Sequence, residues 1–327
     1  MSNTQQHRTI WRTGFFIIFL LAPILDIFRL DLTLGHFIIF GQNWQLGIRD
    51  VPADVAAFNL ITRAFLPIAL VIGVGGWISW RWGRLYCGWL CPHFSVVEMI
   101  NSLMRRASGK TTLWLNKRMP PQQSDGTTVT PNKAWWPGVA VAVMFFSALW
   151  AITLLTYLLP PLEVWGNLFS GQLTRNQFIF ITAGTILLTL EFTLARHLFC
   201  RFGCAVGLAQ SLIWMANHKA MVIAFDRSRA AACASCDKSC EHACPMRLKP
   251  RQIKRKMFSC TQCQQCVQAC ERVSETAGRD NLLKLVDGDD ALQVSERDFG
   301  HRPNVPDNCF AANDSVNHYI PLKQIED

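Results

Sequence analysis

The sequence predicts an α-helical membrane bundle of about four transmembrane helices, arranged as two hairpins and joined to a small α+β domain. Three observations favour this class. About half of the 327 residues are hydrophobic and only 17% are charged, which is less charge than an average soluble domain carries. The hydrophobic residues gather in runs long enough to span a bilayer. Twelve of the thirteen cysteines fall in four tight clusters, a pattern typical of metal ligands in a reducing compartment.

The apolar runs give the positions of the expected spans. They lie near Gly14–Leu30, Leu60–Trp80, Trp135–Leu159 and Phe178–Phe199. The first run resembles a signal peptide, but it lacks a small-residue cleavage site and its apolar character continues past Pro23. We therefore expect the first run to be a retained span.

The basic residues predict the orientation. Few of them lie in segments 33–59 and 160–177. The loop between the two hairpins carries Arg81, Arg84, Arg105, Arg106, Lys110, Lys117, Arg118 and Lys133. By the positive-inside rule, we expect this loop and both termini in the cytoplasm of a bacterium, and the chain in its inner membrane. A net charge of +9 would also suit nucleic acid, but no basic stripe interleaved with aromatic residues is present, which argues against that class.

The resulting segments follow one another in a simple order. They are a first transmembrane helix (1–32), a periplasmic loop (33–59), a second transmembrane helix (60–82), a cytoplasmic loop with a CxxxCP motif (83–134), a transmembrane hairpin that ends in a CxxxC motif (135–204), an interfacial helix (205–221), a cysteine-rich domain (222–294) and a polar tail (295–327).

Several polar features of these segments carry further expectations. Asp26 and Arg63 could pair across the first hairpin, and Glu191 is a candidate for a quinone or proton site because ionisable groups in a membrane are costly and usually functional. The stretch 120–132 has the composition of a mobile connection. Trp214 would anchor the interfacial helix at the membrane surface.

Two cysteine clusters have the spacing of a bacterial ferredoxin. The cysteines of the downstream run are Cys260, Cys263, Cys266 and Cys270. Those of the upstream run are Cys233, Cys236, Cys240 and Cys244. The downstream run has Glu271 where proline is usual, and the upstream run has one extra residue before Cys240. Two such runs in tandem predict an α+β domain of the bacterial 2[4Fe–4S] ferredoxin type.

The fourth ligand of each cluster in such domains comes from the other run. The first cluster would then be held by Cys233, Cys236, Cys240 and Cys270. The second would be held by Cys260, Cys263, Cys266 and Cys244. The alternative is a pair of structural zinc sites, but zinc ribbons show two well-separated CxxC pairs rather than four cysteines in one short run, twice. The basic run 247–256 between the two cysteine runs could dock an acidic electron donor or anionic lipid head groups, or be merely solvated.

The remaining clusters form an internal repeat at the predicted inner membrane edge. Cys87 and Cys91 follow the second span, and Cys200 and Cys204 follow the fourth, each pair after a leucine and an aromatic residue. If the hairpins form a parallel repeat, the four thiols converge. Soft thiolates would suit Cu(I), a further iron–sulfur centre or a redox dithiol, and buried inert cysteines are the plain alternative.

The stretch Gly83–Pro92, together with the order of residues from Gln210 to Arg229, resembles the CcoG/FixG/RdxA membrane polyferredoxins. These belong to a wider group that includes NapH- and NosR-like proteins. The resemblance implies reduction of Cu(II) during assembly of a respiratory oxidase, with copper-handling or oxidase-assembly proteins as partners. The sequence departs from the pattern at Ala205, where proline would follow Cys204, in its longer first ferredoxin run, and in ending without the family's further C-terminal span and domain.

Three functions remain open at this stage. The chain could be a CcoG-like cupric reductase, a NapH-like quinol dehydrogenase subunit that passes electrons to a partner reductase, or a non-catalytic metal-binding assembly factor. No flavin motif, CxxCH haem site or nucleotide-binding loop is present in the sequence. The first electron donor must therefore be a redox partner protein or a quinol.

Overall fold

The computed structural model describes residues 3–115, 118–234 and 236–292. The expected polar tail 295–327 and the isolated Cys309 lie outside these residues. The chain divides into two compact units. The first unit comprises Met1–Trp11, Gly76–Trp136 and His197–Asp327, and the second comprises Arg12–Gly75 and Pro137–Arg196. Helices α1 (Asn3–Leu21) and α3 (Leu66–Trp82) contribute residues to both units.

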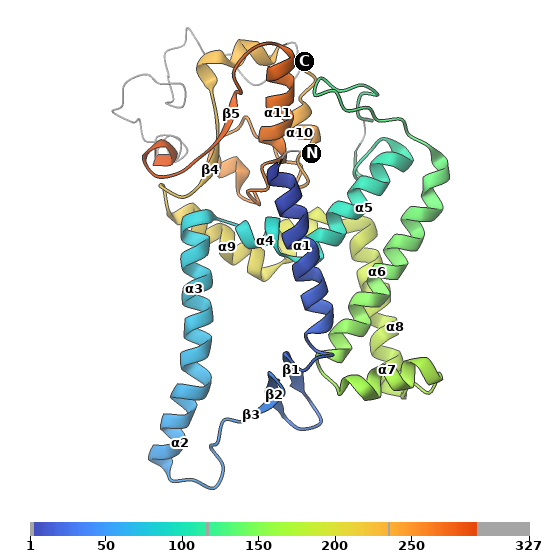
Figure 1. The fold of residues 1–327 in the computed structure, drawn as a ribbon, viewed down its shortest axis with the longest axis vertical. Helices are drawn as coiled ribbons and strands as arrows, with labels where there is room; N and C mark the ends of the chain where they lie inside the picture. The colour runs from blue at the N-terminus through green and yellow to red at the C-terminus, as the bar shows by residue number, and fades with distance from the viewer. Residues whose placement is uncertain (1–2, 116–117, 235, 293–327) are drawn as a thin grey trace. The chain divides into compact units, whose positions relative to one another are not determined.

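The second unit is built on the helices α6 (Trp136–Thr156) and α8 (Arg175–Leu190), which lie side by side (Figure 1). They are joined through α7 (Pro161–Ser170). The Thr189 hydroxyl donates to the Met144 sulfur at 3.7 Å, which links the two long helices. The first turn of α8 is fixed by a capping box between Thr174 and Gln177, an arrangement that satisfies backbone donors at a helix start.

Three helical segments of the described chain are long and apolar enough to cross a membrane. They are Ala53–Trp82, Lys133–Thr156 and Arg175–Ala195. The first of these joins α2 (Ala53–Leu60) to α3 through a π-helical turn at Ile61–Phe65. Its most apolar stretch is not buried anywhere in the protein, as expected of a helix whose solvent is lipid. Three of the four expected spans are therefore present as apolar helices. The helix that corresponds to the expected span Leu60–Trp80 begins earlier, at Ala53.

The expected first span Gly14–Leu30 is wrong in its extent. Helix α1 begins at Asn3 and ends at Leu21, and Phe28–Asp31 form strand β1. Pro23 explains the stop, because proline cannot continue the backbone hydrogen bonds of a helix and restricts the residue before it. The polar first half of α1 also keeps it outside the set of long apolar helices. Its second half packs on α6 in the second unit, where the rings of Phe19 and Trp150 lie 4.6 Å apart.

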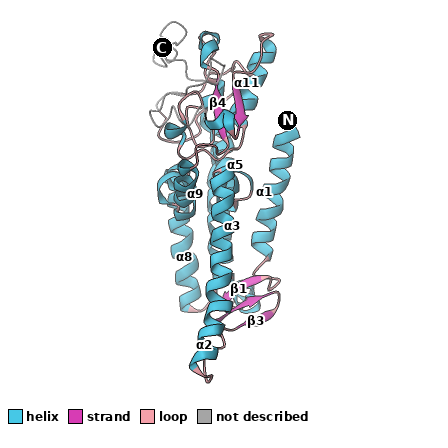
Figure 2. Cartoon of the chain, turned by 90° about the vertical axis from the view of Figure 1, so that its left-hand side faces the viewer, coloured by secondary structure: helices cyan, strands magenta, loops and turns pink. Residues whose placement is uncertain are grey.

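The expected outer loop 33–59 contributes two strands, β2 and β3, to a small antiparallel sheet (Figure 2). Strand β1 pairs with β2 (His36–Ile39), which pairs with β3 (Gln42–Trp44). The expected pair between Asp26 and Arg63 does not form. Asp26 binds Arg29 at 2.5 Å, and Arg63 donates to the Gln45 carbonyl at 3.2 Å. Asp26 therefore pairs with Arg29, three residues along the chain, rather than with the distant Arg63.

The first unit contains the cysteine-rich part of the chain. Strands β4 (Val222–Phe225) and β5 (Leu283–Val286) pair antiparallel, with Val222 opposite Val286. Helix α10 (Ser239–His242) packs against α11 (Gln265–Thr276). All four residues of β4 are buried, so this strand forms part of the core.

Three further helices of the first unit connect this core to the membrane-edge cysteines. They are α4 (Leu85–Trp89), α5 (Pro92–Ser108) and α9 (Ala205–Ala216). Helix α9 lies where the interfacial helix is expected, and its position at a membrane surface remains a prediction. The expected role of Trp214 is wrong. Its side chain is fully buried, its Nε1 donates to the Met221 carbonyl at 2.9 Å, and the Lys254 ammonium lies 5.0 Å from its ring centre. Trp214 is a core residue rather than a membrane anchor.

Candidate metal centres

The structure gathers the cysteines of the two ferredoxin-like runs around two separate cavities. The first cavity is lined by Cys233, Cys236, Cys240 and Cys270, together with Arg251 and apolar residues such as Phe225 and Leu283. The second cavity is lined by Cys244, Cys260, Cys263 and Cys266, with Ile223, Met246 and Met257 among its apolar neighbours. Each cavity thus receives three cysteines from one run and one from the other.

The chemistry of the two linings suits an iron–sulfur cluster. Cysteine thiolates are the usual ligands of such clusters, and among the described residues no acidic side chain lines either cavity. Within the described chain, no three Cys, His, Asp or Glu side chains lie close enough together to hold a single metal ion. A zinc site would require such convergence, because its ligands sit about 2.3 Å from one ion. The cavities therefore fit a larger group better than a zinc ion.

Burial opposes free thiolates in both cavities. It raises the pKa of Cys233 to about 11, although the charges of Arg251 and Arg279 act in the opposite direction. It also raises the pKa of Cys260 to about 12. A thiol with such a pKa is protonated at neutral pH, so these cysteines need a bound metal centre to become thiolates. In the second cavity, the Leu248 backbone N–H donates to the Cys244 sulfur at 3.3 Å.

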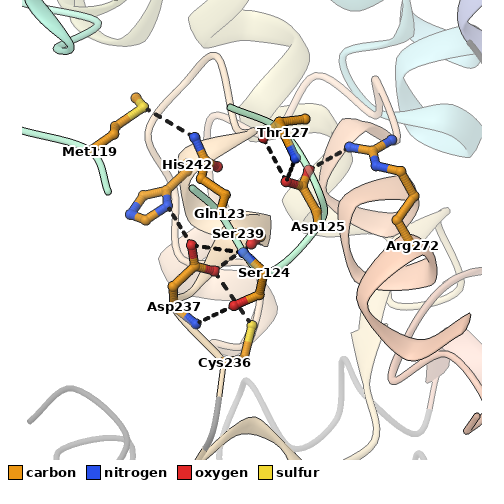
Figure 3. Close-up of polar contacts among 10 residues, drawn as sticks. All are labelled: Met119, Gln123, Ser124, Asp125, Thr127, Cys236, Asp237, Ser239, His242 and Arg272. Carbon is orange, nitrogen blue, oxygen red and sulfur yellow. Dashed lines mark hydrogen bonds and ion pairs between the residues drawn. The ribbon is translucent and has the colours of Figure 1, made fainter. Parts of the chain in front are cut away.

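A loop at residues 119–128 makes polar contacts with the segment that carries Cys236 and with α11 (Figure 3). The Ser124 backbone N–H donates to the Asp237 carboxylate, and the Asp237 N–H donates back to the Ser124 hydroxyl, both at 3.1 Å. Asp237 also accepts from the Cys236 thiol at 3.8 Å. Arg272 of α11 binds the buried Asp125 at 2.6 Å. The stretch 120–132, which its composition presents as a mobile connection, is thus tied to the cysteine-rich domain by specific contacts.

A second set of contacts surrounds the loop that carries Cys260 and Cys263. The Gln5 side chain donates to the Cys263 carbonyl at 2.8 Å, and Gln265 donates to Glu98 at 2.7 Å. Glu98 also binds Arg8 at 2.6 Å, with both side chains almost completely buried. Residues from the start of α1, from α5 and from α11 therefore meet beside the second cavity.

Helix α4 packs directly on the same loop. Arg8 Nε donates to the Gly88 carbonyl at 2.7 Å, and Trp89 Nε1 donates to the Gln262 carbonyl at 3.3 Å. A Cβ atom on Gly88 would lie 2.0 Å from the Thr261 carbonyl oxygen, so only glycine allows this approach. The sequence offered no signal for Arg8 or Glu98, because their partners are distant in the chain.

The membrane-edge cysteines occupy equivalent local positions. Cys91 is the N-cap of α5, and Cys204 is the N-cap of α9. Cys87 lies in α4, and Cys200 lies in a π-helical turn at Phe199–Gly203. Cys87 and Cys200 are buried, whereas Cys91 and Cys204 are half-buried. The repeat seen in the sequence is thus matched by a repeat in local structure.

Arg84 links the two pairs. Its Nη2 donates to the Cys200 carbonyl at 2.7 Å and lies 3.8 Å from the Cys87 sulfur. The Cys87 thiol donates to the Gln210 side chain at 3.2 Å. Burial, only partly offset by the charge of Arg84, raises the pKa of Cys87, and Cys204 is close enough to contribute to the rise. Burial also raises the pKa of Cys91 to about 12.

The basic run 247–256 is only partly solvated, since Arg255 and Lys256 are exposed, and its expected docking role remains a prediction. Arg251 and Lys254 are buried rather than solvated. Arg251 binds Glu241 and lines the first cavity, and Lys254 Nζ donates to the Asn217 carbonyl at 2.7 Å. These cations stabilise the interior of the domain. Glu191 lies in the second unit, at the start of the π-helical turn that continues α8, and its proposed quinone or proton role remains a prediction.

Cysteine-lined cavities and apolar spans together describe a membrane-type iron–sulfur protein, and comparison with known proteins supports this class. Residues 62–111 match a family model described as a 4Fe-4S binding domain, which supports an iron–sulfur cluster in this chain. The matched residues contain Cys87 and Cys91 but neither ferredoxin-like run. No solved structure matches the chain.

Three curated proteins illustrate the similarity. YccM of Escherichia coli, which is named for electron transport, is 23% identical over 71% of this chain and 58% of its own length. The regulatory protein NosR of Pseudomonas aeruginosa is 24% identical over 64% of this chain and 25% of its own length. An uncharacterized protein of Methanocaldococcus jannaschii is 22% identical over 83% of this chain and 86% of its own length. The chain therefore spans little more than half of YccM.

Proposed function

We propose that this chain is a membrane-bound iron–sulfur electron-transfer protein. The observation that carries the proposal is the pair of cavities, each lined by four cysteines drawn from both runs. That grouping is the one expected of a two-cluster ferredoxin domain. The similarity to YccM, whose name refers to electron transport, supports the same function.

In this function, Cys233, Cys236, Cys240 and Cys270 hold one [4Fe–4S] cluster, and Cys244, Cys260, Cys263 and Cys266 hold the other. When bound, each cluster accepts or releases one electron without breaking a covalent bond. The protein residues fix the ligands, exclude water and set the local charge. Arg251 contributes a positive charge beside the first cluster, and the Leu248 N–H stabilises the Cys244 sulfur, both of which tune reduction potentials.

The finer proposal concerns the electron donor and acceptor. The resemblance of Gly83–Pro92 to the CcoG family supports Cu(II) as the acceptor, whereas the similarity to NosR supports the wider NapH- and NosR-like group. In the second case, a quinol would donate and a partner reductase would accept. Reduction of the clusters by a quinol analogue in detergent would favour the quinol-linked relay. Stoichiometric formation of Cu(I) from Cu(II) by the reduced protein would favour cupric reduction.

The test of the main proposal is the metal content of protein purified without oxygen. The Cys263→Ser variant should lose about four iron atoms and one cluster signal relative to the wild type. Cys309→Ser is the matched control, because Cys309 belongs to no cysteine cluster, and it should lose none. Stoichiometric zinc in place of iron, with no broad visible absorbance, would overturn the proposal. Clusters that cannot be reduced reversibly would instead indicate a non-catalytic assembly factor.

A further inference from the structure

Arg84 is a buried cation whose donors are only partly used. Its side chain is 1% exposed, and its guanidinium carries five N–H donors and a permanent charge. Nη2 reaches the Cys200 carbonyl and the Cys87 sulfur. Within the described part of the chain, Nε and Nη1 have no hydrogen-bond partner. A buried cation is costly unless a nearby negative charge compensates it.

The surrounding backbone makes room for this guanidinium. A Cβ atom on Gly207 would lie 2.3 Å from Arg84 Nη2 and 3.1 Å from the Cys200 carbonyl oxygen. The Gly207 N–H also donates to the Cys204 sulfur at 3.4 Å. Gly207 therefore leaves room for the Arg84 guanidinium and also donates to the Cys204 sulfur. Arg84 thus lies close to both cysteine pairs, Cys87 with Cys91 and Cys200 with Cys204.

The thiols themselves lie where negative charge is favoured. Cys91 caps the N-terminus of α5, a helix of 17 residues, and Cys204 caps that of α9, a helix of 12 residues. Helix N-termini carry partial positive charge and stabilise thiolates. Arg84 adds a full positive charge between the pairs. Four thiols, two helix N-termini and one unpaired cation are complementary to a metal centre of net negative charge.

We propose that Cys87, Cys91, Cys200 and Cys204 together hold a third iron–sulfur cluster, and that Arg84 balances its charge. The inference rests on the proposed function, which it extends to the membrane edge. The 4Fe-4S family match contains Cys87 and Cys91 only, so a four-thiolate cluster there needs two ligands from elsewhere. Outside the ferredoxin-like runs, Cys200 and Cys204 are the other cysteines of the described chain.

A single ion with three or four protein ligands suits this site less well. Within the described residues, no three candidate ligands lie close enough to share one ion, whereas a cluster takes ligands that are farther apart. A Cu(I) ion held by two thiolates is the competing occupant, and the iron and copper contents distinguish it from a cluster. The third cluster would also adjoin the second cavity, because Gly88 of α4 lies against Thr261, which lines that cavity. The arrangement gives electrons a route between the ferredoxin-like clusters and the membrane edge.

The first experiment counts iron and resolves cluster signals by electron paramagnetic resonance in the full chain. The wild type should contain about twelve iron atoms, rather than the eight that two clusters require. Cys204→Ser should remove about four iron atoms and one signal, and Cys263→Ser should remove a different four with a different signal. If the wild type holds about eight iron atoms, all lost with the ferredoxin-type cysteines, the third cluster is absent but the proposed function stands. Copper bound at the membrane-edge thiols, with full iron in Cys204→Ser, would also overturn the inference.

The second experiment tests Arg84 through the reduction potential of the third cluster. Arg84→Met should make this potential more negative, since reduction adds charge that the cation no longer balances, or should empty this site alone. Arg84→Lys should restore most of the wild-type behaviour. Gly207→Ala should act like Arg84→Met, because the added methyl group displaces the guanidinium.

Arg201→Met is the matched control for this series. This variant removes the same charge next to Cys200. The Arg201 guanidinium, however, lies over the Phe202 ring, 5.1 Å from its centre. The reduction potential of the third cluster should therefore stay at the wild-type value. The signals of the other two clusters report whether each variant has folded. An unchanged third potential and full iron in Arg84→Met would overturn the role of Arg84.

Discussion

At the scale of single residues, buried arginines recur beside the cysteine-bearing segments. Arg8, Arg84 and Arg251 are each at most 3% exposed, and each contacts or adjoins a segment that carries cysteines. Their charges can offset the cost of gathering thiolates away from water. The cysteine spacing alone grouped the four residues that line each cavity, since it reflects a local loop and a known exchange of the fourth ligand. It could not select these arginines from the other basic residues, because cysteine spacing does not determine which basic side chains become buried in the fold.

The ion pair between Asp125 and Arg272 provides a residue-scale prediction. Burial would raise the pKa of Asp125, but hydrogen bonds from Arg272 and Thr127 outweigh it and lower this pKa. The stabilisation is therefore complete above the unfolded pKa of about 3.9 and is lost only as the pH falls through the lower folded value. Asp125→Asn should weaken closure of the 119–128 loop by about 1–2 kcal/mol.

Hydrogen exchange measured by mass spectrometry would check this prediction. The amides of the 119–128 loop should exchange roughly tenfold faster in Asp125→Asn at neutral pH, since about 1.4 kcal/mol corresponds to that factor. In the wild type, the free energy of loop closure should be constant from about pH 8 to about pH 5. The exposed Asp280 offers a control, because Asp280→Asn leaves the loop contacts intact. Equal exchange in both variants would contradict a clasping role for Asp125.

At the scale of elements, the contact between α4 and the Cys260–Cys263 loop is the tightest constraint near the second cavity. Gly88→Ala would place a methyl group 2.0 Å from the Thr261 carbonyl oxygen. Backbone must then move, and overpacking of this kind typically costs about 1–3 kcal/mol. We expect this variant to lose iron from the second cluster while the first is retained.

Cluster-specific spectra and iron content would measure the effect. Gly76→Ala is the matched control, because a Cβ atom at Gly76 meets nothing within 4 Å. Full iron in Gly88→Ala, or equal loss from both ferredoxin-type clusters, would contradict the dependence of the second cluster on α4.

Some helices of the fold can be predicted from the sequence, and other features cannot. The periods and lengths of the apolar runs predicted three long helices, and the composition after Cys204 predicted α9. Two expectations fail for physical reasons. The apolar run continues past Pro23, but proline ends the helix there. The burial of Trp214 depends on packing from distant segments, which the local sequence does not contain. The strands β1–β3 are short, and such strands leave little periodic signal.

At the scale of the whole molecule, the start of α1 bears on the number of membrane crossings. Gln5 and Arg8 contact Cys263 and Gly88 within the first unit. Gly88 lies in α4, shortly after the helix Ala53–Trp82, which is long enough to cross a membrane. If that helix crosses once, the chain must also cross between Trp11 and Ala53 to begin on the same side. We therefore expect α1 to complete a fourth crossing, despite its polar first half.

Labelling of introduced cysteines with a membrane-impermeant reagent would test this topology. Cysteines placed at Asn43 and Asn167 should react from the outer side, and one placed at Ser124 should react only after the membrane is opened. The positive-inside pattern gives the same expectation. Labelling of position 43 only from the cytoplasmic side would show that α1 does not cross.

The sharing of cysteines between distant segments has a consequence for the order of events during synthesis. The first set of four thiols is completed only by Cys270 and the second only by Cys266, so neither set exists until nearly the whole described chain has left the ribosome. If the proposed third cluster forms, Cys87 and Cys91 must also wait for Cys200 and Cys204. We therefore expect metal delivery to follow synthesis of the cysteine-rich domain, and we expect a truncated chain to expose unfilled thiols.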